Sequence, residues 1–292
     1  MQPLHWNRAK RDVRRICACA MAALAIAACT TDEEARQTPQ PTIVPTDYSQ
    51  VSLFADSAWA LSDDKVAGFK SLTSKSPRYW GRYLCNATPE YDMTADELDV
   101  FRRNDVVPIL ILQPGQDALS MGTGPADRAA QCFTTRFDAL KAGGYPFPPD
   151  VMIFLDVEPG TELSAVFLER LVKDLQYYGV LDGRARFGIY LSGAYSANVR
   201  TLINTEIDNG LPISMVWFAR YIDCGPLPYW EEANTAPLGT INVHTEFWQY
   251  AANCSAYGSS NAGFDLNAEK PPAMAPISSN AQPAGSYAAA SR

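Results

Sequence analysis

Two carboxylates follow an apolar run in the middle of the chain. The segment Val151–Leu155 is entirely apolar, and Asp156 and Glu158 come directly after it, separated by one residue. Side chains alternate along a β-strand, so residues two apart point the same way. If the run is a buried strand, it presents both acids together at its carboxyl end. Such a pair suits glycoside hydrolysis, in which one carboxyl acts as acid/base beside a second anionic group. The alternative is structural, because acids at strand ends also cap helices or pair with cations.

The elements that must position this pair follow from alternating strand and helix signals. We expect strands at residues 51–55, 79–84, 106–112, 151–155 and 187–191. We expect helices at residues 63–72, 94–103, 125–142, 164–178 and 195–207. Three further strands, at 214–218, 245–248 and 263–265, follow without full helices between them.

Five βα units and three more strands make eight strands, which is the number that closes a barrel. Apolar strands alternating with helices predict a parallel sheet that is covered on both faces. We therefore predict a single-domain α/β fold, a TIM-like (β/α)5β3 barrel with its site at the carboxyl ends of the strands. An open doubly wound sheet is the alternative, but no glycine-rich phosphate turn follows the first strand.

Further acids stand at predicted strand ends. Asp56 ends the first strand, Asp265 ends the last, and Asp223 lies past the sixth. In a closed barrel the first and last strands are neighbours, so these acids would converge with Asp156 and Glu158 on one pocket. Such crowding should raise at least one pKa. Aromatic residues near the same strand ends either stack on a sugar or fill the barrel core.

The first 28 residues have the pattern of an export signal. Five basic residues precede an apolar run, Ile16–Ala28, that is short for a membrane span. The run ends in Ile26-Ala27-Ala28-Cys29, which resembles a bacterial lipobox and predicts lipidation of Cys29. An ordinary secretory signal cut near Ala28 is the alternative. Arg14-Arg15 is also compatible with twin-arginine export.

Composition divides the rest of the chain. Residues 29–48 are rich in Thr, Pro, Gln and acids and predict a flexible tether, residues 49–268 form the barrel, and residues 269–292 predict a disordered tail. We expect an exported protein that is lipid-anchored in the cell envelope, at the outer membrane or the periplasmic face, or else secreted. The lipid is the only expected membrane contact, and the protein is expected to be a monomer.

Charge and histidine content exclude several functions. The net charge is −8 and becomes more negative without the basic leader, so the overall field disfavours nucleic acid. Outside the leader the only histidine is His244, which rules out a site with several histidine ligands. A Ser-His-Asp triad would have to use His244, and no nucleophile elbow lies near it. We predict no metal and no cofactor.

Four cysteines lie beyond the leader and Cys29. They are Cys85, Cys132, Cys224 and Cys254, an even number that favours disulfides in an exported chain. Of the three possible pairings we favour Cys85–Cys132 with Cys224–Cys254, because each pair would join successive loops. Free buried thiols are the alternative.

An ordered set of short motifs resembles one known group. The motifs are Asp56, Gly81-Arg82-Tyr83-Leu84, Met93-Thr94-Ala95-Asp96-Glu97-Leu98, Val107-Pro108-Ile109, Asp156-Val157-Glu158, Gly188-Ile189-Tyr190, Trp217-Phe218-Ala219, Trp248-Gln249-Tyr250 and Phe264-Asp265-Leu266-Asn267. The set covers about residues 50–268 and resembles family 25 glycoside hydrolases, the Chalaropsis-type lysozymes. It resembles more closely the related glycoside-hydrolase-like domains of unknown function. The first strand lacks the glycine expected two residues before Asp56.

The resemblance implies a (β/α)5β3 barrel that cleaves β-1,4 bonds next to N-acetylmuramic acid in peptidoglycan. Glu158 would be the general acid/base, and Asp156 would orient the substrate's 2-acetamido group, which attacks the sugar carbon. Asp56 and Asp265 would shape and charge the pocket. Retention by substrate assistance fits the spacing, because Asp156 and Glu158 are too close together to admit an inverting water.

We therefore predict a cell-wall glycoside hydrolase with Glu158, Asp156, Asp56 and Asp265 as catalytic residues. The residues expected to bind the glycan are Arg82, Tyr83, Gln113, Tyr190, Trp217, Arg220, Trp248, Gln249 and Tyr250. A catalytically inactive barrel that binds a glycan of the envelope is the alternative, and an envelope scaffold without a glycan ligand is a third. A Lys or Arg side chain that neutralises the acids would favour the scaffold.

Overall fold

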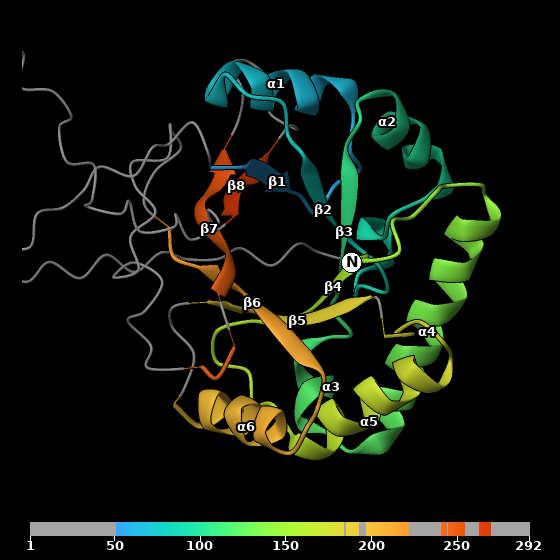
Figure 1. Ribbon diagram of the computed structural model, residues 1–292, viewed down its shortest axis with the longest axis vertical. Coiled ribbons are helices and arrows are strands. Elements are labelled where there is room, and N and C mark those ends of the chain that lie inside the picture. The colour runs from blue at the N-terminus through green and yellow to red at the C-terminus, as the bar shows by residue number, and fades with distance from the viewer. Residues whose placement is uncertain are drawn as a thin grey trace, which may run out of the picture. The chain divides into compact units, whose positions relative to one another are not determined.

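The computed structural model describes residues 51–183, 185–192, 197–221, 241–243, 245–254 and 263–269. These residues form one closed barrel of eight strands in sequence order (Figure 1). The predicted signal, lipidation site, tether and residues 270–292 of the predicted tail lie outside the described residues, as do Asp223, Cys224 and His244, whereas Glu269 belongs to the last strand and not to the tail. None of the described helices has both the length and the apolar character of a membrane span.

All eight strands lie where they were predicted. They are β1 (Leu53–Asp56), β2 (Tyr79–Tyr83), β3 (Val107–Leu112), β4 (Met152–Val157), β5 (Arg186–Ser192), β6 (Ile213–Ala219), β7 (Thr245–Cys254) and β8 (Phe264–Glu269). Strands β1 to β7 pair in parallel, whereas β8 is antiparallel to both β7 and β1. The parallel pairing expected of the alternating strands is confirmed for β1 to β5, whereas β8, for which no direction was predicted, is antiparallel.

The reversal of β8 changes how Asp265 is placed. Asp265 lies at the start of its strand and not at its end, and it is the register partner of Asp56. A strand that runs backwards brings its amino end to the carboxyl ends of its parallel neighbours. Asp265 therefore still reaches the predicted end of the barrel.

Helices follow the first five strands and cover that side of the barrel (Figure 1). They are α1 (Asp63–Thr73), the short η2 (Pro89–Tyr91) and η3 (Ala95–Glu97), α2 (Leu98–Arg103), α3 (Gln116–Ser120), α4 (Thr123–Ala142), α5 (Ala165–Tyr177) and α6 (Ala197–Asp208). The Ser62 side chain caps α1, and Thr94 with Glu97 forms the expected capping box. Most of the β6–β7 connection lies outside the described residues, so the full (β/α)5β3 order stays a prediction.

Each strand is buried on both faces, which creates two apolar layers. The inward side chains, among them Phe54, Phe154 and Trp217, fill the barrel. The outward side chains pack under the helices in a larger layer. Gly81 faces inward, where a Cβ would lie 2.6 Å from Cβ of Asp56 and 2.9 Å from Cη2 of Trp217. The missing side chain at Gly81 is what lets Asp56 and the indole occupy that space.

One predicted disulfide is present. Cys85, just after β2, is bonded to Cys132 on α4, which confirms the first predicted pair. Cys254 of the second predicted pair is buried on β7, and its expected partner Cys224 lies outside the described residues.

Candidate active site

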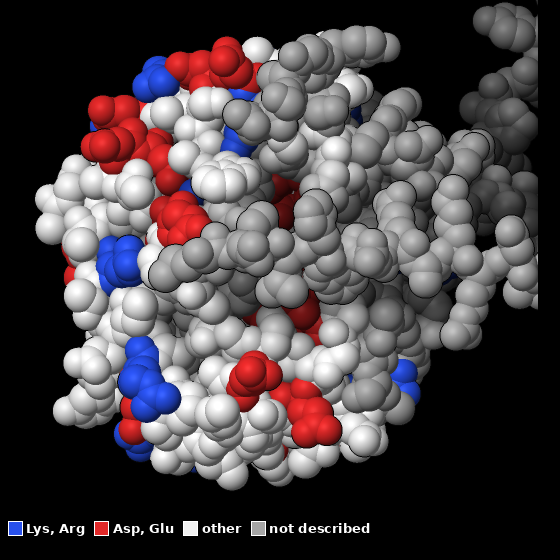
Figure 2. All heavy atoms as spheres, turned by 180° about the vertical axis from the view of Figure 1, so that it is seen from behind, with Lys and Arg blue, Asp and Glu red and all other residues white. Residues whose placement is uncertain are grey.

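The predicted catalytic acids gather at one end of the barrel. Asp56 and Asp265 stand opposite each other on β1 and β8. Asp156 ends the inward face of β4, where the Tyr83 hydroxyl lies 3.4 Å from its Oδ2. Glu158 follows β4 and is close enough to raise the pKa of both Asp156 and Asp265. Figure 2 shows Asp and Glu side chains recessed in the middle of one face of the molecule.

Neutral amides hold Asp56 and Asp265 together. The Gln249 Nε2 group donates to Oδ1 of Asp56 at 3.3 Å and also to Oδ2 of Asp265. Asn267 Nδ2 donates to the same Asp56 oxygen at 2.8 Å, and its own Oδ1 accepts from Trp217 Nε1 at 2.8 Å. Asn267 was not among the predicted site residues. Its signal in the sequence is its position two residues after Asp265, on the same face of a strand.

A directed chain of hydrogen bonds orients Asp156. The backbone N–H of Thr88 donates to Asn86 Oδ1, so the Asn86 amide must present its Nδ2 to Gln113 Oε1, at 2.8 Å. Gln113 Nε2 then donates to Oδ2 of Asp156 at 2.7 Å. The other oxygen of Asp156, Oδ1, is buried and accepts no hydrogen bond from the described residues.

The pKa values of all four acids are raised. Burial raises the pKa of Asp56 and Asp156 well above the ordinary value, with Asp265 adding to the first and Glu158 to the second. Burial raises the pKa of Asp265 to about 6 and also raises the pKa of Glu158. Among the described residues, no Lys or Arg forms an ion pair with any of the four. Each of the four therefore binds its proton at a higher pH than an exposed carboxyl group does.

Tyrosines complete the inner face. The Tyr190 hydroxyl donates to Gln249 Oε1 at 2.5 Å and lies 3.5 Å from the hydroxyl of Tyr221. Burial raises the pKa of both Tyr83 and Tyr190 well above the ordinary value, so both keep their protons as hydrogen-bond donors. Trp217 is fully buried and reaches the acids through Asn267, so its predicted contact with a glycan is wrong.

A cavity of about 770 Å³ opens beside Asp56 and Asp265, two of the four acids. Asp56, Tyr83 and Asp265 line one side of it, and the loop from Ser57 to Ser62, between β1 and α1, lines another. This volume lies within the range of small-molecule sites.

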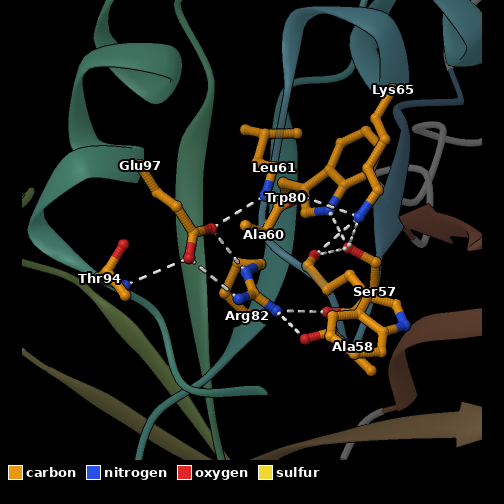
Figure 3. A network of polar contacts seen from close by, with 10 residues as sticks. Ser57, Ala58, Ala60, Leu61, Lys65, Trp80, Arg82, Thr94 and Glu97 are labelled. Atoms are coloured by element: carbon orange, nitrogen blue, oxygen red, sulfur yellow. Dashed lines mark hydrogen bonds and ion pairs between the residues drawn. The ribbon is translucent and has the colours of Figure 1, made fainter. Parts of the chain in front are cut away.

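The prediction that Arg82 contacts a substrate is wrong. Strand alternation points Gly81 and Tyr83 inward, so Arg82 points outward, where its side chain is fully buried. Its guanidinium donates to both carboxylate oxygens of Glu97 and to the backbone oxygen of Ser57 (Figure 3). No surface of Arg82 is left for a ligand.

The same alternation divides the Trp248-Gln249-Tyr250 segment. Gln249 faces the acids, whereas Trp248 and Tyr250 are fully buried in the layer under the helices. Their predicted contact with a glycan is wrong for this reason. Trp248 Nε1 instead donates to the backbone oxygen of Arg220 at 3.0 Å. The side chain of Arg220 is exposed just past β6, and its predicted contact with a glycan stays a prediction.

Comparison with known proteins supports the fold. No protein-family model and no curated protein matches this sequence. An uncharacterized protein of B. stearothermophilus superimposes with a TM-score of 0.56 at 17% identity, over 75% of this chain and 95% of that one. A glycosyl hydrolase 25 of Streptococcus pneumoniae gives a TM-score of 0.44 at 18% identity, over 75% of this chain and 87% of that one. A psychrophilic glycoside hydrolase family 10 endo-β-1,4-xylanase gives 0.37 at 17% identity, over 62% and 68%. At such identities the first similarity establishes a shared fold and nothing more.

Proposed function

We propose that the protein is a glycoside hydrolase that acts on a peptidoglycan-like glycan of the cell envelope, with Glu158 as its general acid/base. The observation that carries the proposal is the gathering of four carboxyl groups at one barrel end, with no Lys or Arg ion pair to them among the described residues. Acids with raised pKa values beside a cavity are typical of sites that transfer protons. A (β/α)5β3 order of lysozyme type accounts for their placement.

Glu158 is suited to both halves of an acid/base cycle. Burial raises its pKa, so a larger fraction of it is protonated near neutral pH than of an exposed glutamate. In the first half it gives its proton to the glycosidic oxygen as the bond to the sugar carbon breaks. In the second half its carboxylate takes a proton from the water that attacks the same carbon.

Asp156 is suited to hold the group that attacks. Its Oδ2 is fixed by Gln113 and Tyr83, and its Oδ1 has no hydrogen-bond donor among the described residues. An N–H of a 2-acetamido group can supply that donor. The acetamido oxygen then bonds to the sugar carbon as the leaving oxygen departs, and water later displaces it, so the configuration is retained.

Export and lipid anchoring belong to the same proposal. The basic leader, its apolar run and Cys29 support a lipoprotein signal. The Cys85–Cys132 disulfide fits an oxidising compartment, because thiols stay reduced in the cytosol. Mass spectrometry of the amino-terminal peptide purified from a bacterial membrane fraction, compared with a Cys29→Ala variant, tests the lipid.

The variant Glu158→Gln tests the chemistry. It removes the transferable proton and keeps the size, so turnover should fall by about 10²–10⁴-fold. The assay is release of reducing ends from purified sacculi, with mass analysis of the products. Glu162→Gln is the matched control, because Glu162 is exposed four residues further along the chain.

Three outcomes separate the candidates. Loss of turnover in Glu158→Gln alone supports the hydrolase. Glycan binding without turnover, unchanged in Glu158→Gln, supports a glycan-binding barrel in its place. A wild-type protein that neither binds nor cleaves any of a broad panel of envelope glycans contradicts both.

A further inference from the structure

Trp59 is an exposed aromatic residue on a wall of the acidic cavity. It lies in the loop between β1 and α1 with 54% of its surface exposed. The same cavity is lined by Asp56 and Asp265. The other described tryptophans, Trp80, Trp217 and Trp248, are fully buried. Trp59 is therefore the described indole that a ligand in this cavity could touch.

Buried charges fix the backbone of this loop at both of its ends. Arg82 Nη1 donates to the backbone oxygens of Ser57 at 2.7 Å and Ala58 at 2.6 Å (Figure 3). The Glu97 carboxylate accepts from the backbone N–H of Leu61 at 2.9 Å. Arg82 and Glu97 are themselves joined at 2.8 Å, so both ends of the loop are attached to one ion pair.

A third buried charge fixes the middle of the loop. Lys65 Nζ donates to the backbone oxygens of Trp59 and Ala60, both at 2.8 Å. The Ser57 hydroxyl donates to the same Trp59 oxygen at 2.7 Å. Burial lowers the pKa of Lys65 to about 8, which shows that its charge is held out of water at a cost. The buried charges of Arg82, Glu97 and Lys65 all bond to the backbone of this short loop, so they hold it in one conformation.

The ring of Trp59 is supported from the side. It meets the ring of Tyr91 nearly at right angles, at 84° and 4.9 Å between centroids. An aromatic residue that is held in place while half exposed loses little conformational freedom when a ligand covers it. The C–H groups of a pyranose ring form an apolar face, and covering that face with an indole removes apolar surface of both partners from water.

We propose that Trp59 is a stacking platform for one sugar ring of the glycan whose cleaved bond lies at Glu158. This inference rests on the proposed function and adds a subsite to it. The platform lies on the β1 side of the cavity, next to the Asp56–Asp265 pair. The sugar it binds therefore belongs to the part of the chain that extends from the acids toward β1 and α1.

Binding without turnover tests the platform. Titration calorimetry would measure binding of a tetrasaccharide of alternating N-acetylglucosamine and N-acetylmuramic acid to Glu158→Gln, alone and combined with Trp59→Ala or Trp59→Phe. We expect Trp59→Ala to weaken binding at least tenfold and Trp59→Phe to weaken it less. Tyr177→Ala is the control, because Tyr177 on α5 is 84% exposed and does not line the cavity. In the active protein, Trp59→Ala should raise KM more than it lowers kcat.

The outcomes distinguish this inference from the function on which it rests. If Glu158→Gln binds the tetrasaccharide and Trp59→Ala binds it within twofold of that value, the platform is refuted and the hydrolase stands. If neither protein binds and the wild type does not cleave sacculi, both proposals fail together. If the thermal unfolding midpoint of Trp59→Ala equals that of the wild type, weaker binding is not due to misfolding.

Discussion

Strand β2 separates two groups of buried charges that are treated in opposite ways. On its outer side, Glu97 is paired with Arg82 at 2.8 Å. On its inner side, Asp56 and Asp156 receive hydrogen bonds from side-chain amides and a tyrosine hydroxyl, and their pKa values are raised. A full cation turns a buried carboxylate into a structural tie, whereas neutral donors leave it ready to bind a proton.

The contrast shows how one barrel can contain both a structural ion pair and a group of acids with raised pKa values. The outer group fixes the loop that forms a cavity wall, and Asp56 of the inner group lines the cavity itself. Strand alternation keeps the two apart, because Arg82 cannot turn inward without moving the inward-facing Tyr83 outward. Substitutions in the outer ion pair should therefore change stability at every pH, whereas substitutions among the inner acids should change how stability depends on pH.

The largest expected effect comes from breaking the outer pair. Arg82→Met leaves Glu97 buried without its cation and should lower the free energy of unfolding by about 3–5 kcal/mol. Urea denaturation followed by circular dichroism measures it. Arg103→Met is the control, since Arg103 pairs with Asp63 at the surface and its loss should cause little change. Equal stability of Arg82→Met and the wild type would mean that the pair is not structural.

An intermediate effect should appear in the pH dependence of the inner group. The pKa of Asp265 is about 6 in the folded protein and 3.8 ordinarily, so the folded state binds more protons between these values. Stability should therefore fall as pH rises from about 4 to about 6, by on the order of 3 kcal/mol from this one group. Asp265→Asn removes the group and should flatten the slope.

Urea denaturation at pH 4 and pH 7 measures this difference. Asp96→Asn, an exposed acid on η3, is the control and should keep the wild-type slope. A slope in Asp265→Asn as steep as that of the wild type would show that folding does not raise the pKa of Asp265.

The smallest expected effect tests how tightly the inner group is packed. Gly81→Ala places a methyl group 2.6 Å from Cβ of Asp56 and should cost about 1–3 kcal/mol of stability as neighbours shift. Gly122→Ala is the control, because no atom lies within 4 Å of its added Cβ. Thermal unfolding compares the two. Identical midpoints would indicate that Asp56 moves without cost and that its position is not strictly determined.

The sequence predicts the architecture well because its strands are apolar on both faces. That property gives strong signals for where strands lie, as at Val107–Leu112 and Met152–Val157. It gives no signal for direction, since an antiparallel strand buried on both faces has the same pattern. The reversal of β8 was missed for this reason.

The same property explains the errors in the site. When both faces of a strand are apolar, a polar residue within it can be assigned to either face. Arg82 and Trp248 were assigned to the pocket although Tyr83 and Gln249 occupy it, and period-two spacing allows only one member of each pair to face inward. Trp59 was missed because it lies in a loop, where no periodic pattern indicates its exposure.

The direction of β8 also determines where the polypeptide chain enters and leaves the barrel. Because β8 runs opposite to β1, its last residue, Glu269, donates its backbone N–H to Ser52 at 2.9 Å, just before β1 begins. The first and last residues of the barrel segment therefore lie together at the base of the barrel, opposite the carboxylates. Any segment that continues from either end of the barrel therefore starts at its base and not beside the four carboxylates.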